Sequence, residues 1–207
     1  MDIRDPLTAD ELGVIVSELL VATADDSDPL VDDTVPQVLK LLRQRLDMDV
    51  VFVSEFIQGR RMFRFVDAAA GAPDIRAGGS NPLEESVCQR IVDGRLPEHI
   101  PDLAQVPADQ LPAMPFRVGA HLSTPIMMTD GSAYGTLCCF SAAPSPGLRE
   151  EDLKNLRLCA TLVAKKLELA RKQDYREPPP DWQLEPMAGE VYESKVWTTP
   201  SVRRKGG

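Results

Sequence analysis

Four cysteines and two histidines are the side chains of this 207-residue chain best suited to metal binding, thiol redox chemistry or chromophore attachment. Cys138 and Cys139 are adjacent in the apolar run YGTLCCFS, whereas Cys88 and Cys159 are isolated in segments of helical character. Neighbouring strand residues point to opposite faces of a sheet, so Cys138 and Cys139 cannot serve one site. Zinc ligands usually occur in closely spaced pairs, which this sequence lacks. The sequence therefore predicts no metal site. It favours the interpretation that the cysteines are small apolar residues that fill the protein core.

Polar side chains occupy alternate positions in two predicted strands, one of which contains Cys138. His121 and Ser123 share one face of a predicted strand, and Thr136 and Cys138 share one face of the next. A ligand pocket needs a few converging polar groups, so these four residues are candidate ligand-binding residues. For His121 the alternative is a core histidine bonded to a nearby loop.

Three further candidates lie outside these two strands. Arg90, on a predicted short helix, and Arg117, at a strand entrance, have the chemistry to clamp an anion, although both also fit a solvated surface. His99 lies in the proline-rich segment at 95–117, which predicts a long loop of the kind that forms binding loops or lids.

The elements that must position these residues are two hairpins and three helices. DVVFVSEFIQGRRMFRFVD, at 49–67, predicts a hairpin turning at Gly59. VGAHLSTPIMMTDGSAYGTLCCFSA, at 118–142, predicts a second hairpin, and Asp130-Gly131 predicts a type I′ turn with positive φ at both residues. A short helix is expected from Pro82, with Asn81 as its N-cap and Gly94 after its end.

Longer helices are expected after Thr34 and from 148 to about 172. In the second of these, apolar residues at alternating steps of three and four predict a coiled-coil seam for a homodimer. Its members are Leu153, Leu156, Ala160, Val163, Leu167 and Ala170. The alternative is a single broad stripe that faces the protein's own core.

Composition limits the class of protein. The net charge of −9 argues against general nucleic-acid binding, which needs a basic surface. No apolar run reaches the roughly 18 residues of a membrane span, and the N-terminus MDIRDPLTADE has no signal-peptide pattern. We therefore expect a cytoplasmic protein with no membrane partner. Three regions are predicted: an acidic helix and linker at 1–32, a domain at 33–172, and a proline-rich tail at 173–207.

Three stretches carry a family likeness: LDMDVVFVSEF at 46–56, PLEESVCQRIVDGRLPEHIPD at 82–102 and VGAHLSTPIMMTDGSAYGTLCCFS at 118–141. They resemble GAF domains, especially those beside diguanylate cyclase, phosphodiesterase or histidine kinase modules in bacterial signalling proteins. The resemblance implies an α/β fold (α+β, GAF/PAS-like) with a central antiparallel sheet of five or six strands. Terminal helices would cover one face, and the short helix and long loop would roof a pocket on the other.

From this likeness we expect a non-catalytic sensor that binds an unidentified small molecule under the 95–117 loop and signals through dimeric terminal helices. It would act either on a separate output protein or as part of a longer chain. Two alternatives stay open: a ligand-free dimerisation module, and a thiol redox sensor in which Cys138 pairs with Cys88 if the roof helix crosses nearby. Phytochrome-like members attach bilin through a cysteine in the roof segment, but PAMPFRVGAHL at 112–122 has none. Bilin is therefore disfavoured, as are haem binding through His121 and a sulfoxide reductase activity.

Overall fold

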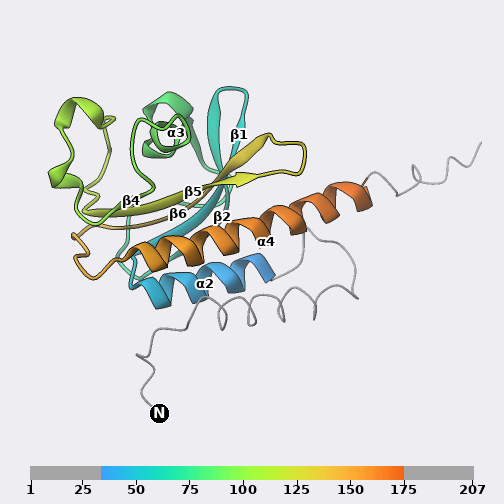
Figure 1. The fold of residues 1–207 in the computed structure, drawn as a ribbon, viewed down its shortest axis with the longest axis horizontal. Coiled ribbons are helices and arrows are strands. Elements are labelled where there is room, and N and C mark those ends of the chain that lie inside the picture. Colours follow the sequence, from blue (N-terminus) through green and yellow to red (C-terminus); the bar gives the residue numbers. More distant parts are fainter. Residues whose placement is uncertain (1–33, 175–207) are drawn as a thin grey trace, which may run out of the picture.

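The computed structural model describes residues 34–174 and contains one six-stranded antiparallel sheet with the order β3-β2-β1-β6-β5-β4 (Figure 1). The strands are β1 (Val50–Ile57), β2 (Arg60–Ala68), β3 (Ser80–Pro82), β4 (His99–Ile100), β5 (Ala120–Met127) and β6 (Ala133–Ser141). The helices are α2 (Thr34–Leu46), α3 (Val87–Val92) and α4 (Glu150–Asp174), with 3-10 turns at Leu83–Glu85, Leu103–Gln105 and Ala108–Gln110. The predicted acidic segment at 1–32 and nearly all of the predicted tail at 173–207 lie outside the described residues.

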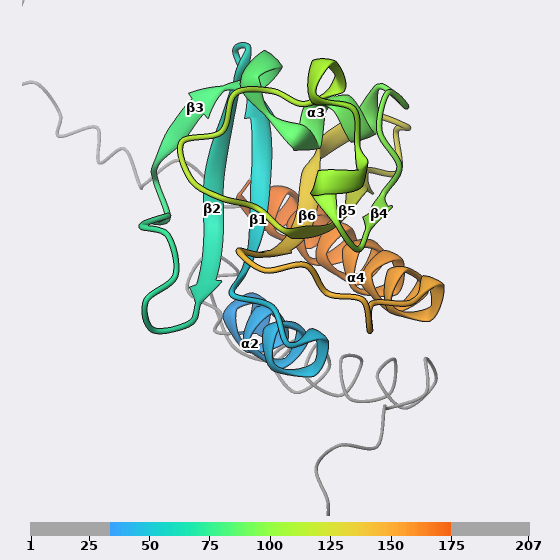
Figure 2. The same ribbon diagram turned by 90° about the vertical axis from the view of Figure 1, so that its left-hand side faces the viewer.

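The two long helices lie on one face of the sheet, and α3 with the long loop lies on the other (Figures 1 and 2). The alternation of side chains in the central strands explains this layering. Val51, Leu137 and Cys139 point to the helix layer and join its apolar core. Phe52 and Cys138, one residue along, point to the opposite layer. The predicted α/β fold and the opposite orientations of Cys138 and Cys139 are therefore confirmed.

The apolar stripe of α4 faces the sheet and α2. Leu153, Leu156, Ala160 and Val163 are at most 4% exposed and belong to the domain's own core, against which Leu167 also packs. Ala170 is half-buried. The assignment of Leu153, Leu156, Ala160 and Val163 to a dimer seam was therefore wrong, because an apolar sheet face beside an amphipathic helix buries that stripe within one chain. For the half-buried Leu167 and Ala170 it stays a prediction. Dimerisation itself stays a prediction, and Leu169, 56% exposed, is the large apolar residue that α4 leaves on its surface.

The first hairpin turns at Gly59 as predicted, whereas the second differs from the predicted geometry. Gln58 and Gly59, with φ of 50° and 71°, form the two-residue turn with both φ positive that joins β1 to β2. In the second hairpin Gly131 has φ of 81° but Asp130 does not have positive φ, so the predicted type I′ turn was wrong. The loop is longer: the Gly131 N–H donates to the Met128 carbonyl at 3.0 Å, and Asp130 accepts the Ser132 N–H at 2.8 Å.

The roof helix begins later than predicted. Asn81 and Pro82 belong to β3, which pairs with β2, and Leu83–Glu85 forms a 3-10 turn. Ser86 caps α3, its hydroxyl accepting the Gln89 N–H. Asn81 was wrongly assigned as the N-cap because its side chain accepts a hydrogen bond from Arg61 on β2. Gly94, with φ of 71°, follows the helix end as expected. Within residues 34–174, none of the helices combines the length and apolar character of a membrane span.

Candidate functional site

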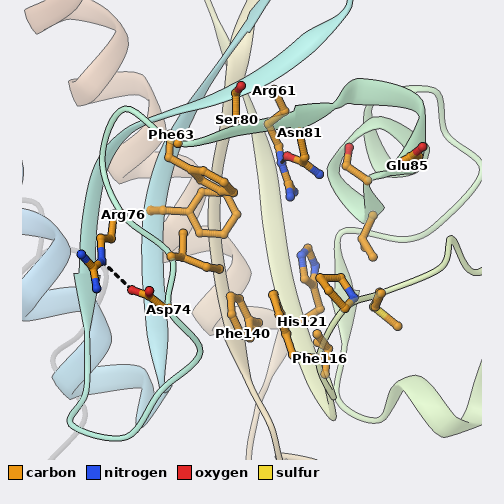
Figure 3. Close-up of a pocket in the computed structure, with 18 of the residues that line it drawn as sticks. Arg61, Phe63, Asp74, Arg76, Ser80, Asn81, Glu85, Phe116, His121 and Phe140 are labelled. Carbon is orange, nitrogen blue, oxygen red and sulfur yellow. Dashed lines mark hydrogen bonds and ion pairs between the residues drawn. The ribbon is translucent and has the colours of Figure 1, made fainter.

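A pocket of about 290 Å³ lies between the sheet and the roof formed by α3 and the loop at 113–118 (Figure 3). Its volume is at the small end of the roughly 300–1,000 Å³ typical of ligand sites. Every strand except β4 contributes at least one residue to the pocket lining. The site is thus built from segments that are distant in sequence.

Aromatic rings form much of the pocket wall. Phe52 and Phe63 meet edge to face with centroids 5.0 Å apart, and Phe52 meets Phe140 at 6.4 Å. Phe116, from the roof loop, stacks on Phe140 at 5.4 Å with an interplanar angle of 16°. These four rings offer flat apolar surfaces to a ligand.

Arg61 supplies a cation at this aromatic wall. Its guanidinium lies 4.9 Å from the centroid of Phe63 and 5.5 Å from that of Phe52. Its Nε–H donates to Asn81 Oδ1 at 3.0 Å, and Figure 3 shows the two side chains next to each other. The other pocket arginine, Arg76, is paired with Asp74 at 2.6 Å (Figure 3). Arg61 is therefore the lining arginine that is held in place by aromatic contacts.

A fully buried polar cluster lies on the same face of the sheet. Ser54 Oγ and Thr136 Oγ1 are 2.9 Å apart, and the Cys138 thiol is 3.1 Å from Thr136 Oγ1. Ser123 Oγ lies 2.8 Å from Cys138 Sγ. The fold thus brings Ser123, Thr136 and Cys138 together, as the alternation predicted, but none of the three lines the pocket itself.

The roof helix adds a second thiol to this cluster. Cys88 Sγ, on α3, lies 3.0 Å from Cys138 Sγ and accepts a hydrogen bond from Arg61 Nη1 at 3.1 Å. Burial raises the pKa of the Cys88 thiol, but its hydrogen bond with Cys138, the charge of Arg61 and His121 together lower that pKa well below its ordinary value. Burial, together with the hydrogen bond and charge of Cys88, raises the pKa of Cys138. Cys88 is therefore the more acidic thiol of the pair.

The two remaining cysteines lie on the other side of the sheet, in the helix-layer core. Burial raises the pKa of Cys159 to about 12, and burial with the neighbouring Cys159 raises that of Cys139 well above its usual value. Both are protonated near neutral pH and suit the predicted role of small apolar filling.

His121 is the predicted candidate that lines the pocket. Its side chain is 4% exposed, and its Nδ1 is buried without a hydrogen-bond partner among the described residues. One ligand atom each of Cys88, His121 and Cys138 lie within 4.8 Å of one another. The spacing rule missed this group because three separate elements supply its members.

The other three candidates do not line this pocket. His99 pairs with Leu122, whose side chain faces the helix layer, and His99 Nδ1 is 3.3 Å from Glu150 Oε1 on α4. Arg90 Nη1 donates to the Gln110 carbonyl and so ties α3 to a 3-10 turn. Arg117 is exposed. Arg90 lies on α3 and His99 on β4, and ligand binding by these three residues elsewhere on the protein stays a prediction.

Sequence reasoning missed Arg61, Asn81, Phe52 and Phe63, which line the pocket from β1, β2 and β3. A usable signal was present in QGRRMFRFVD: Arg61 and Phe63 are two residues apart and therefore share a strand face.

Comparisons with known proteins agree with this architecture. The sequence model of the GAF domain matches residues 31–167. A GAF domain from Acinetobacter phosphoenolpyruvate-protein phosphotransferase is 13% identical with a TM-score of 0.60, covering 79% of this chain and 93% of that one. Free methionine-R-sulfoxide reductase from Neisseria meningitidis is 14% identical with a TM-score of 0.61, covering 83% and 99%.

The phycocyanobilin-bound GAF domain of a cyanobacterial phytochrome is 13% identical with a TM-score of 0.60, covering 83% of this chain and 99% of that one. No curated protein matches the sequence. The structural likenesses show the fold alone, whereas the match of the family's sequence model spans more than half of the chain. The chain belongs to the GAF domain family.

Proposed function

We propose that this protein is a non-catalytic signalling sensor that binds a small molecule in the pocket between the sheet and the roof. The observation that carries the proposal is the pocket of about 290 Å³, which combines four aromatic rings with Arg61 and His121. A mostly apolar cavity with a few fixed polar groups is the usual form of a small-molecule site. The family is a sensor and ligand-binding fold of signalling proteins, which agrees with this role.

The chemistry of the wall suggests the ligand class. Arg61 favours an anionic group, with which arginine forms charge-assisted hydrogen bonds. The stacked pair Phe116 and Phe140 favours a flat apolar body. A small aromatic carboxylate meets both conditions and fits the limited volume.

A route for the signal runs through the sheet. Phe52 and Phe140 line the pocket, whereas their strand neighbours Val51 and Cys139 pack in the core that contacts α4. Ligand occupancy that shifts β1 and β6 would therefore change how α4 packs. We propose that α4 passes this change to a partner, either a second copy of the chain or a separate output protein.

Filling the pocket tests the proposal. Ile75 lines the pocket, so Ile75→Trp is expected to abolish binding of small aromatic carboxylates, with benzoate and its hydroxylated analogues as probes. Ile57→Trp is the matched control, because Ile57 lies at the end of β1, is 37% exposed and does not line the pocket. Native mass spectrometry and thermal shift would measure binding and also detect a co-purified molecule. Equal binding by both variants, or none by the unmodified protein, would overturn the proposal.

A second candidate function, thiol redox sensing, is favoured by the 3.0 Å separation of Cys88 Sγ and Cys138 Sγ. With a peroxide as oxidant, the two thiols would lose two protons and two electrons to form a disulfide, and hydrogen peroxide would be reduced to two waters. The new bond would tie α3 to β6 and so fix the roof on the sheet.

Peroxide treatment is expected to remove two of the four free thiols without linking separate chains. Thiol titration after unfolding, together with the intact mass, would measure this. Cys88→Ser should retain all three of its remaining thiols. Cys159→Ala should still lose two thiols, because Cys159 is distant from the pair and its pKa of about 12 keeps it protonated. Equal loss from Cys88→Ser would exclude the Cys88–Cys138 disulfide.

A further inference from the structure

Tertiary structure brings together Cys88, His121 and Cys138, three buried side chains of the types that bind metal ions. Cys88 comes from α3, His121 from β5 and Cys138 from β6. Their ligand atoms lie within 4.8 Å of one another, and both thiols are fully buried. The sulfurs belong to an apolar cluster with Phe52, Phe63 and Phe140, so the group is shielded from water.

Neighbouring side chains can stabilise a negative charge on the two sulfur atoms. Arg61 Nη1 donates to Cys88 Sγ at 3.1 Å. Ser123 Oγ, 2.8 Å from Cys138 Sγ, and Thr136 Oγ1, 3.1 Å from it, can turn their hydroxyl hydrogens toward a thiolate. Such outer-shell donors orient and stabilise metal-bound ligands.

His121 adds an independent observation. Its Nδ1 is buried without a hydrogen-bond partner among residues 34–174, and the residue is only 4% exposed. Buried polar atoms are usually satisfied, because an unpaired one costs about 1–3 kcal/mol. One ring nitrogen of His121 lies within 4.8 Å of both sulfurs, so the imidazole is placed where a metal ligand would be needed.

We propose that Cys88, Cys138 and His121 bind one thiophilic metal ion, Cu(I), beneath the roof helix. Thiolate sulfur is a soft ligand that selects ions such as Cu(I) and Zn(II), and imidazole suits both. On binding, each thiol still protonated releases its proton to solvent and His121 coordinates as the neutral imidazole. No electron is transferred.

Charge balance decides between the two ions. Two thiolates and the Arg61 guanidinium together carry one negative charge, so Cu(I) gives a neutral group. Zn(II) would leave a net positive charge beside two fully buried sulfurs, which is costly. Three protein ligands also suit a low-coordinate ion, whereas zinc commonly adds a fourth ligand.

The sulfur atoms must separate to accept the ion. Metal–sulfur bonds of about 2.3 Å at the roughly 120° angle of a three-coordinate ion place two sulfurs about 4.0 Å apart, so the present 3.0 Å has to open by roughly 1.0 Å. Because Cys88 is on a short roof helix, a small shift of α3 provides this opening. His121 also lines the pocket, so the metal would lie directly behind the pocket wall.

The test uses the full chain, reduced beforehand, and titrates Cu(I) against a competing Cu(I) chelator. We expect one Cu(I) per chain and a near-ultraviolet thiolate-to-copper band. Cys88→Ser and Cys138→Ser should each weaken binding by at least about 100-fold, at or beyond the upper end of the 10–100-fold effect of an outer-shell change. Cys159→Ala, on the other sheet face, should bind Cu(I) as the unmodified protein does.

Two further measurements keep the proposal falsifiable if a variant fails to fold. X-ray absorption of the copper-loaded unmodified chain should report two sulfur ligands and one nitrogen ligand, and His121→Gln should remove the nitrogen. In the folded chain, bound copper should also prevent the peroxide-induced loss of the Cys88 and Cys138 thiols, measured by thiol titration after the copper is removed. Copper held equally by Cys88→Ser, or Zn(II) held more tightly than Cu(I), would overturn the proposal. The pocket test with Ile75→Trp is independent of these outcomes.

Discussion

Replacing Leu156 with alanine is expected to lower the free energy of unfolding by about 2–5 kcal/mol. Leu156 is 0% exposed and packs in the core between α4, α2 and the sheet, so its removal leaves a cavity that the two layers cannot close fully. Urea unfolding followed by circular dichroism would measure the loss. This is the largest single effect that we expect from a side-chain truncation in α4.

Leu169→Ala is the matched control on the same helix. Leu169 is 56% exposed, so its truncation should change stability by less than about 0.5 kcal/mol. If the chain dimerises through the open face of α4, Leu169→Ala should shift sedimentation toward the monomer, while Leu156→Ala acts mainly on stability. A dimer that depends on Leu156 with no loss of monomer stability would restore the seam that the structure excludes.

Replacing Gly135 with alanine should cost at least about 3 kcal/mol, the upper end of the roughly 1–3 kcal/mol usual for overpacking. A Cβ at Gly135 would lie 1.9 Å from the Ser54 carbonyl oxygen and 2.9 Å from Glu55 Cα. Because these atoms belong to the backbone of β1, the strand itself would have to move. The adjacent contact between Ser54 and Thr136 would be disturbed as well.

Gly147→Ala provides the control for this substitution. No atom lies within 4 Å of the Cβ that alanine would add there, and the glycine does not have positive φ. We expect its stability to change by less than about 0.5 kcal/mol. Denaturant unfolding of both variants would measure the difference, and an equal effect at the two glycines would contradict the close approach of β6 to β1.

The sequence predicted those parts of the fold that depend on local periodicity. Alternation in β1 and β6 separates Phe52 from Val51 and Cys138 from Cys139, and both separations hold in the structure. The same alternation places Ser123 and His121 on one face of β5. The turn at Asp130 and the cap at Asn81 failed because local rules compete with longer-range hydrogen bonds, such as the one from Arg61 to Asn81.

By itself the sequence determined which side chains share one face of a strand, because side chains in strands alternate with the fixed period of the backbone. It thereby determined that Cys138 points away from Cys139. Only the tertiary structure decided that Cys88 lies 3.0 Å from Cys138 and that His121 completes the group. Those distances depend on where α3 crosses the sheet, which is set by the packing of whole elements. The pocket and the proposed metal site therefore exist only in the folded chain.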